Sequence, residues 1–136
     1  YTPCVKEKEF INKVHRHLSK EVYRWKINDP YHGGVPDTYY SGPNSNCWIE
    51  YKYKHALPAK CTSKIKINLS EQQRIWLTRQ KEHRVFTYTV FASQDLVYVM
   101  EDFTIKEITL EEFNKRAVSF KNFIEALTKH CLGDKK

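Results

Sequence analysis

Two groups of turn-forming residues in the first half of the chain constrain its fold more than any other feature. Residues 28–35 read Asn-Asp-Pro-Tyr-His-Gly-Gly-Val, and residues 42–46 read Gly-Pro-Asn-Ser-Asn. Glycine, proline and asparagine clustered in this way favour turns. The segments that they delimit, 36–41 and 47–54, are short and rich in strand-forming residues. The sequence therefore predicts that these two segments pair as a hairpin.

Helices are expected on both sides of this hairpin in the chain. Residues 5–19 place apolar side chains at four-residue spacing, which is typical of an amphipathic helix. Ser70 is a good N-cap for a second helix, which we expect to end near His83. A helical tail is expected over residues 110–132, with a break near Ser119.

Further strands are expected at 21–27, 85–93 and 95–101, the last two joined by a Gln-Asp turn. Residues 104–109 are a candidate edge strand, and residues 55–67 are expected to form a loop or a ragged extension. The order helix, three strands, helix, two strands, helix predicts one α/β domain over residues 1–136 with a single mixed sheet.

Charge and cysteine content bear on partners and compartment. The net charge is +7, which favours a polyanionic partner, nucleic acid above all. No apolar run approaches the roughly 18 residues of a membrane span, so no membrane partner is expected. The four cysteines show no CxxC spacing, and no secretory signal is visible. These features predict free thiols in a reducing cytoplasm.

The strand segment Glu50-Tyr51-Lys52 carries the first candidate chemistry. Side chains on a strand alternate between its faces, so Glu50 and Lys52 point the same way. A carboxylate that holds a metal, beside a lysine that orients water or stabilises charge on phosphorus, suits phosphodiester hydrolysis. A solvent-facing row of alternating charges is the alternative for an isolated Glu-x-Lys.

Asp37 favours a catalytic role for Glu50 and Lys52 over a surface row of charges. It starts the preceding hairpin strand, so the hairpin can bring it against Glu50. Two converging carboxylates repel each other unless a cation lies between them. Mg²⁺ is commonly held by one or two carboxylates together with water and substrate phosphate. An ordinary turn role is the alternative for Asp37 alone.

Pro36-Asp37 followed by Glu50-Tyr51-Lys52 resembles the signature of the PD-(D/E)XK nuclease superfamily. The closer resemblance is to its VRR-NUC and Holliday-junction-resolvase branch, which adds a glutamate on the first helix and a glutamine opening the helix after the lysine. Glu7 and Gln73 are in the matching places, with Glu9 and Gln72 as their alternatives. The resemblance implies a restriction-endonuclease-like core: a central mixed β-sheet flanked by helices, in the order αβββαβ plus a C-terminal helix.

The resemblance also implies roles for these residues. Asp37, Glu50 and the backbone carbonyl of Tyr51 would ligate Mg²⁺, for which Mn²⁺ could substitute. Glu7 would reach the metal through water. Lys52 would act on the attacking water, and Gln73 would position Lys52 or a phosphate of the cut strand.

Basic residues outside the motif are candidates for DNA contact. The segment around 55–67 carries lysines with no acid among them, and either phosphate contacts or a solvated loop would explain them. The candidate DNA-contacting residues are Lys54, Lys60, Lys64, Lys66 and His32.

The function expected from these features is a metal-dependent endonuclease that cuts DNA, with junctions or branches as the preferred substrate. The alternatives are a nuclease of the same fold acting on linear duplex, single strands or RNA, and a non-catalytic nucleic-acid-binding module. A phage-encoded enzyme in host cytoplasm is also expected, because the short domain resembles phage enzymes.

A homodimer is expected as well, because symmetric cutting of two strands needs two active sites. Its candidate surface comprises apolar residues near the C-terminus, which could instead cover the sheet: Phe113, Val118, Phe120, Phe123, Ile124 and Leu127.

Overall fold

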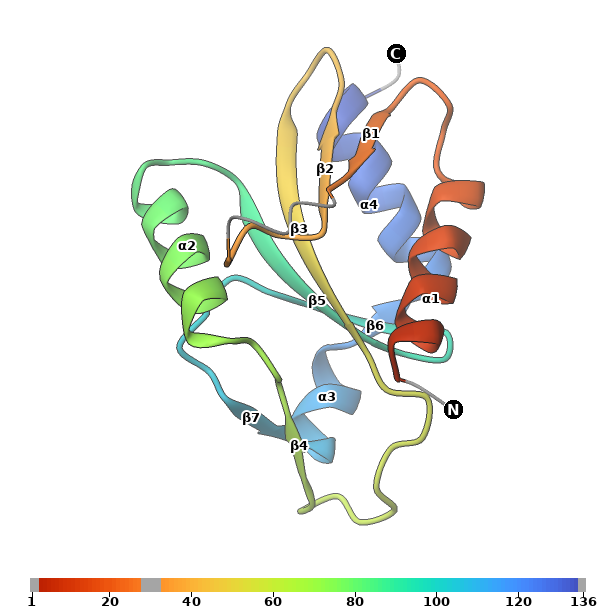
Figure 1. Cartoon of the computed structure of the whole chain (residues 1–136). Coiled ribbons are helices and arrows are strands. Elements are labelled where there is room, and N and C mark those ends of the chain that lie inside the picture. The colour runs from red at the N-terminus through yellow and green to blue at the C-terminus, as the bar shows by residue number, and fades with distance from the viewer. Residues whose placement is uncertain (1–2, 28–32, 135–136) are drawn as a thin grey trace.

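The computed structural model describes the main chain of residues 3–27 and 33–134, with side chains from Lys6 onward. This part of the chain contains four helices and eight strands, and Figure 1 shows their arrangement. In chain order they are α1 (Pro3–His17), β1 (Tyr23–Lys26), β2 (Thr38–Ser41), β3 (Asn46–Tyr53), β4 (Lys64–Lys66), α2 (Glu71–Glu82), β5 (Thr87–Ser93), β6 (Leu96–Met100), β7 (Glu107–Thr109), α3 (Leu110–Arg116), β8 (Val118–Ser119) and α4 (Phe120–Leu132).

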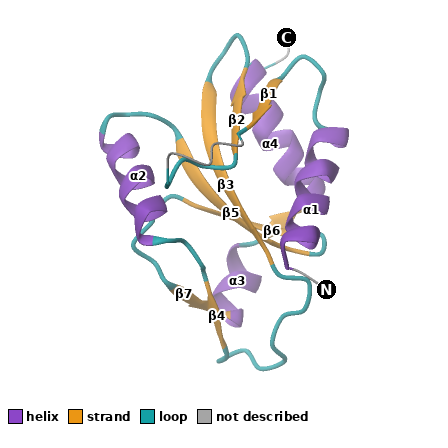
Figure 2. Ribbon diagram, in the orientation of Figure 1, coloured by secondary structure: helices purple, strands orange, loops and turns teal. Residues whose placement is uncertain are grey.

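The main sheet has six strands in the order β1-β2-β3-β5-β6-β8. Its central pair, β3 and β5, is parallel, and the other pairs are antiparallel. The chain leaves β3 through a long loop and passes through α2 before it returns as β5 (Figure 2). The expected mixed sheet flanked by helices is therefore confirmed.

Alternation along β3 assigns its side chains to two cores. Ile49 and Tyr51 are buried in a cluster with residues of α1 and α4, such as Val14 and Leu127. The opposite face of the main sheet packs against α2, as the Thr87 hydroxyl shows by donating a hydrogen bond to the Leu77 carbonyl at 3.3 Å. Figure 1 shows α1 and α4 together on one side, and α2 apart from them. Polar side chains on β3 thus face the α2 side.

Several local expectations are confirmed by the structure. Ser70 caps α2, and its hydroxyl accepts a hydrogen bond from the Gln73 amide. The turn between β5 and β6 is made by Gln94 and Asp95, with Gln94 at a φ of 52°. Ser119 caps α4 directly after the break in the C-terminal tail.

The expectation of a single sheet is wrong. The segment 55–67, expected as a loop or a ragged extension, contains the short strand β4. Residues 104–109 contribute β7, but β7 pairs with β4 in a separate two-stranded sheet, so the chain does not have a single sheet. Each strand has three residues, too few for an alternating pattern to identify, and they pair across about forty positions of sequence.

The apolar positions near the C-terminus serve mainly the core. Phe113, Phe123 and Leu127 are buried, as is Phe120, while Ile124 is half-buried. Val118 alone of the six is exposed, at 40%. In the described ranges no helix combines the length and apolar character needed to cross a membrane.

Candidate active site

The candidate site lies where β2 and β3 separate. Their pairing extends as far as Thr38, which lies opposite Ile49, whereas β3 continues to Tyr53 with β5 on its other side. Asp37 stands at the point of separation, and its Oδ2 accepts a hydrogen bond from the Tyr51 amide at 3.2 Å. A side chain thus replaces the missing strand partner at this amide.

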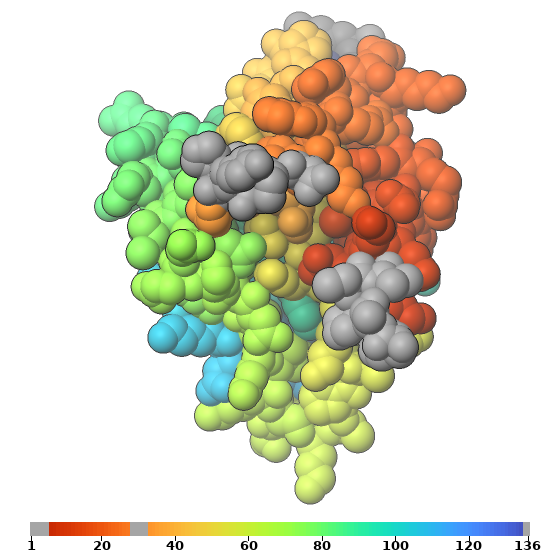
Figure 3. All heavy atoms as spheres, in the orientation of Figure 1, coloured from red at the N-terminus to blue at the C-terminus, as the bar shows by residue number. Residues whose placement is uncertain are grey.

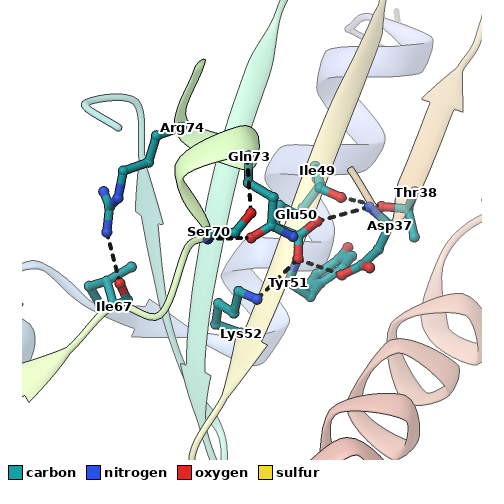
Figure 4. A network of polar contacts seen from close by, with 10 residues as sticks. All are labelled: Asp37, Thr38, Ile49, Glu50, Tyr51, Lys52, Ile67, Ser70, Gln73 and Arg74. Carbon is teal, nitrogen blue, oxygen red and sulfur yellow. Dashed lines mark hydrogen bonds and ion pairs between the residues drawn. The ribbon is translucent and has the colours of Figure 1, made fainter. Parts of the chain in front are cut away.

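The main chain of Asp37 also forms a hydrogen bond with the side chain of Glu50. The Asp37 amide donates a hydrogen bond to Oε1 of Glu50 at 3.1 Å. The hairpin therefore brings the two carboxylates predicted from the sequence together at one place (Figure 4).

Lys52 completes this arrangement on β3. Its Nζ lies 3.3 Å from Oε2 of Glu50, and its side chain is 21% exposed, whereas that of Glu50 is 2% exposed. The two carboxylate oxygens of Glu50 thus have different partners, the Asp37 amide and the Lys52 ammonium. A buried carboxylate therefore has a more accessible cation beside it (Figure 4).

Burial sets the protonation of Glu50. It raises the pKa of this carboxyl to about 8, and the negative charge of Asp37 acts in the same direction, while Lys52 partly opposes both. A divalent cation between the carboxylates would favour their charged forms.

Glu7 on α1 is near enough to this centre for its charges to act on the Glu7 carboxyl. The pKa of this half-buried carboxyl is raised, first by burial and then by the charge of Asp37, while the charges of Lys52 and Lys26 partly oppose the rise. Glu9 is exposed and lines a groove of about 390 Å³ with Lys13 and other residues of α1 and the β5–β6 turn. Figure 3 shows β3 (yellow) at the bottom of a hollow between α1 (red) and the start of α2 (green).

Gln73 lies at the start of α2 with its carbonyl already engaged. Its Oε1 accepts a hydrogen bond from the Ser70 amide at 2.9 Å, and Ser70 Oγ accepts one from the Gln73 amide at 3.1 Å. The side chain of Gln73 is half-buried, whereas that of Gln72 is exposed. The structure thus shows Gln73 as a capping residue whose Nε2 has no role in the cap.

A glycine allows the start of α2 to lie close to the β1–β2 connection. Gly34 has a φ of +93°, and a Cβ placed on it would stand 2.5 Å from the backbone oxygen of Gln72. Any side chain would clash there, and the backbone conformation favours glycine. This contact fixes the segment leading to Asp37 against the helix that carries Gln73.

The carboxylates of this centre are the groups that could bind a metal ion. Among the residues whose side chains are described, no group of three or more His, Cys, Asp or Glu side chains is gathered closely enough to hold an ion. The pair Asp37 and Glu50 nevertheless fits Mg²⁺, which takes one or two carboxylates and fills its remaining positions with water and phosphate. Each carboxylate oxygen can accept two bonds, so the contacts of Glu50 do not exhaust it.

The other basic candidates do not gather at this centre. Lys64 and Lys66 lie on β4, and Nζ of Lys64 is 3.2 Å from Oε1 of Glu107 on β7. Lys54 and Lys60 are exposed on the loop that follows β3. The segment has no acid in its own sequence, but β7 supplies one. His32 lies outside the described residues.

No protein-family model matches the chain, and no curated protein matches it in sequence. The fold, however, matches that of a solved structure, the Holliday junction resolvase Hjc of the archaeal hyperthermophile Archaeoglobus fulgidus. The two superpose with a TM-score of 0.54 over 89% of this chain and 97% of the other, at 11% identity. The chain has the restriction-endonuclease-like fold. At this identity the likeness concerns the fold alone.

The sequence did not indicate Thr89, a buried threonine on β5. Its Cα is the register partner of Glu50, so it belongs to the same face of the sheet. No local pattern distinguishes it from the other threonine and valine residues of that strand.

Proposed function

We propose that this protein is a metal-dependent nuclease that hydrolyses phosphodiester bonds in DNA. The proposal rests mainly on the contacts that bring Asp37, Glu50 and Lys52 together where β2 and β3 separate. The nuclease-type fold supports it. A protein that only bound nucleic acid would gain nothing from two carboxylates beside the phosphate, because they would repel it.

In this proposal each residue of the candidate site has its own role. Asp37 and Glu50 would hold Mg²⁺ with the backbone carbonyl of Tyr51, and Glu7 would reach it through water. The bound ion would neutralise the carboxylates and polarise the scissile phosphate. Lys52 orients the attacking water and stabilises the negative charge that develops as the P–O bond to the leaving oxygen breaks.

The capping bond leaves Gln73 groups for either of two roles. Its Oε1 accepts one hydrogen bond from Ser70 and has a second lone pair that could accept from Lys52. Its Nε2 is a donor and suits a phosphate oxygen of the cut strand. Gln73 would therefore position Lys52 or that phosphate.

The favoured substrate is junction or branched DNA. The structural neighbour is described as a Holliday junction resolvase, and this chain carries a net charge of +7. Lys54, Lys60 and Lys66 are exposed and would meet the phosphate backbone. Membership of the VRR-NUC and resolvase branch, a phage origin and action in a cytoplasm stay predictions from the sequence.

A cleavage panel tests the function and the substrate together. Four-way junction, flap, nicked duplex, linear duplex, single strand and RNA are incubated with the protein and Mg²⁺, beside Glu50→Gln as a matched control. We expect cleavage of the branched substrates by the wild type and none by the variant. Preferential cleavage of linear or single-stranded substrates would replace the junction assignment. Binding without cleavage of any substrate would favour the non-catalytic alternative.

A further inference from the structure

Thr89 has a buried hydroxyl for which the described part of the protein supplies no hydrogen-bond partner. The residue is 0% exposed, and its Oγ1 is the one side-chain atom found in this condition among the described residues. Buried hydroxyls are rarely left in this state, because removal from water without a new hydrogen bond costs free energy. The exception calls for a partner beyond the described part of the protein.

The position of Thr89 indicates where that partner lies. β3 and β5 run parallel, with Glu50 directly opposite Thr89. Side chains of directly paired residues project from the same face of a sheet, so the hydroxyl and the carboxylate are neighbours on the α2 side. Both side chains are buried, at 0% and 2% exposure.

A second threonine on the same strand provides the contrast. Thr87 is also buried and lies on the same face, two residues earlier, but its Oγ1 donates to the Leu77 carbonyl at 3.3 Å. The two residues thus differ in whether the described residues supply a hydrogen-bond partner for the hydroxyl. The unsatisfied one is the one beside the candidate site.

We propose that Thr89 is a positioning residue of this site, whose hydroxyl holds the Glu50 carboxylate through a bridging water molecule. The inference rests on the proposed nuclease function. Oε1 and Oε2 of Glu50 each have one partner, the Asp37 amide and Lys52, and each oxygen can accept another bond. Water commonly satisfies buried polar groups in this way. Outer partners of metal-binding carboxylates fix their orientation and so affect the affinity for the ion.

Thr89→Val and Thr87→Val are the matched test. Both remove one hydroxyl from the same face of β5 and keep the branched shape. Thermal unfolding is measured without metal, and Mn²⁺ affinity is measured by titration calorimetry without DNA. We expect Thr89→Val to remain folded at the assay temperature and to bind Mn²⁺ about tenfold to a hundredfold more weakly. Thr87→Val should lower the midpoint by a few degrees, because it removes the hydrogen bond from Thr87 to the Leu77 carbonyl, and should bind Mn²⁺ like the wild type.

Thr89→Ser retains the hydroxyl and should restore Mn²⁺ affinity. Wild-type Mn²⁺ affinity in Thr89→Val would overturn the positioning role and leave the nuclease function intact. A wild-type protein that binds no Mn²⁺ would instead refute the metal-dependent function, and this inference with it.

Discussion

Asp37 and Glu50 are joined through the main chain of one and the side chain of the other: the Asp37 amide donates to Oε1 of Glu50 at 3.1 Å. The Asp37 carboxylate meanwhile accepts from the amide of Tyr51, the next residue of β3. The two carboxylates therefore belong to one hydrogen-bonded unit, in which these bonds fix their relative position. A site that is organised before the ion binds loses less conformational freedom on binding.

The first prediction concerns the ion. We expect cleavage with Mg²⁺ or Mn²⁺, and DNA binding with little cleavage in Ca²⁺, because Ca²⁺ accepts looser geometry and more ligands than the reaction allows. Asp37→Ala should abolish cleavage by removing a ligand. Gel assays of cleavage and of binding in each ion are the measurement, and full cleavage in EDTA would end the metal hypothesis.

The second prediction separates catalysis from binding at two neighbouring lysines. Lys52→Ala should slow single-turnover cleavage by at least about a hundredfold, because Lys52 lies beside Glu50 and, in the proposed function, acts on the attacking water. Its DNA affinity should change little, since many phosphate contacts share that task.

Lys54→Ala is the matched control for this variant. Lys54 is exposed at the end of β3, so its loss should weaken binding and leave the single-turnover rate of the bound complex unchanged. If Lys52→Ala cleaved at nearly the wild-type rate, Lys52 would have no catalytic role.

The third prediction follows from the raised pKa of Glu50. A carboxyl whose pKa is about 8 when folded and near 4.5 when unfolded binds more protons in the folded state between those values. The free energy of unfolding therefore falls as pH rises through this window. Glu50→Gln removes the effect and should stabilise the metal-free protein at pH 8 by on the order of 1 to 3 kcal/mol, with little change at pH 4.5.

Urea unfolding at the two pH values is the measurement for Glu50→Gln. Glu125→Gln, which changes an exposed glutamate of α4, is the control and should leave both values near those of the wild type. Equal effects of Glu50→Gln at both pH values would show that Glu50 is not held in its protonated form by burial.

The fourth prediction concerns the basic segment after β3. Changing Lys60, Lys64 and Lys66 together to Ala should weaken DNA binding and reduce its salt dependence. Each lost phosphate contact lowers the slope of log affinity against log salt by about one unit. Lys64 is paired with Glu107, so Lys64→Ala alone should have the smallest effect of the three single variants. An unchanged slope in the triple variant would exclude this segment from the DNA interface.

The fifth prediction is a homodimer as the active species, because paired cuts across a branch need two sites related by a two-fold axis. Light scattering of the free protein and of its DNA complex is the measurement. The C-terminal positions first considered for the interface are mostly in the core, and Val118 is the exposed one. A protein that is monomeric in both states and still makes paired cuts would contradict the prediction.

Local chemistry made part of this protein predictable from its sequence. The hairpin follows from turn residues, the start of α2 from the cap at Ser70, and the shared face of Glu50 and Lys52 from the two-residue period of a strand. Each of these depends on interactions within a few residues of the chain, so the sequence order is enough to show them.

Tertiary packing decided the rest. The pairing of β4 with β7, the burial that raises the pKa of Glu50, and the placement of Thr89 opposite that carboxylate all join segments far apart in the sequence. These features cannot be deduced from the order of the residues, because they arise only when the sheet assembles and packs against α2. The residues of the candidate site could therefore be named from the sequence, whereas its electrostatics and the unsatisfied hydroxyl beside it became visible only in the folded protein.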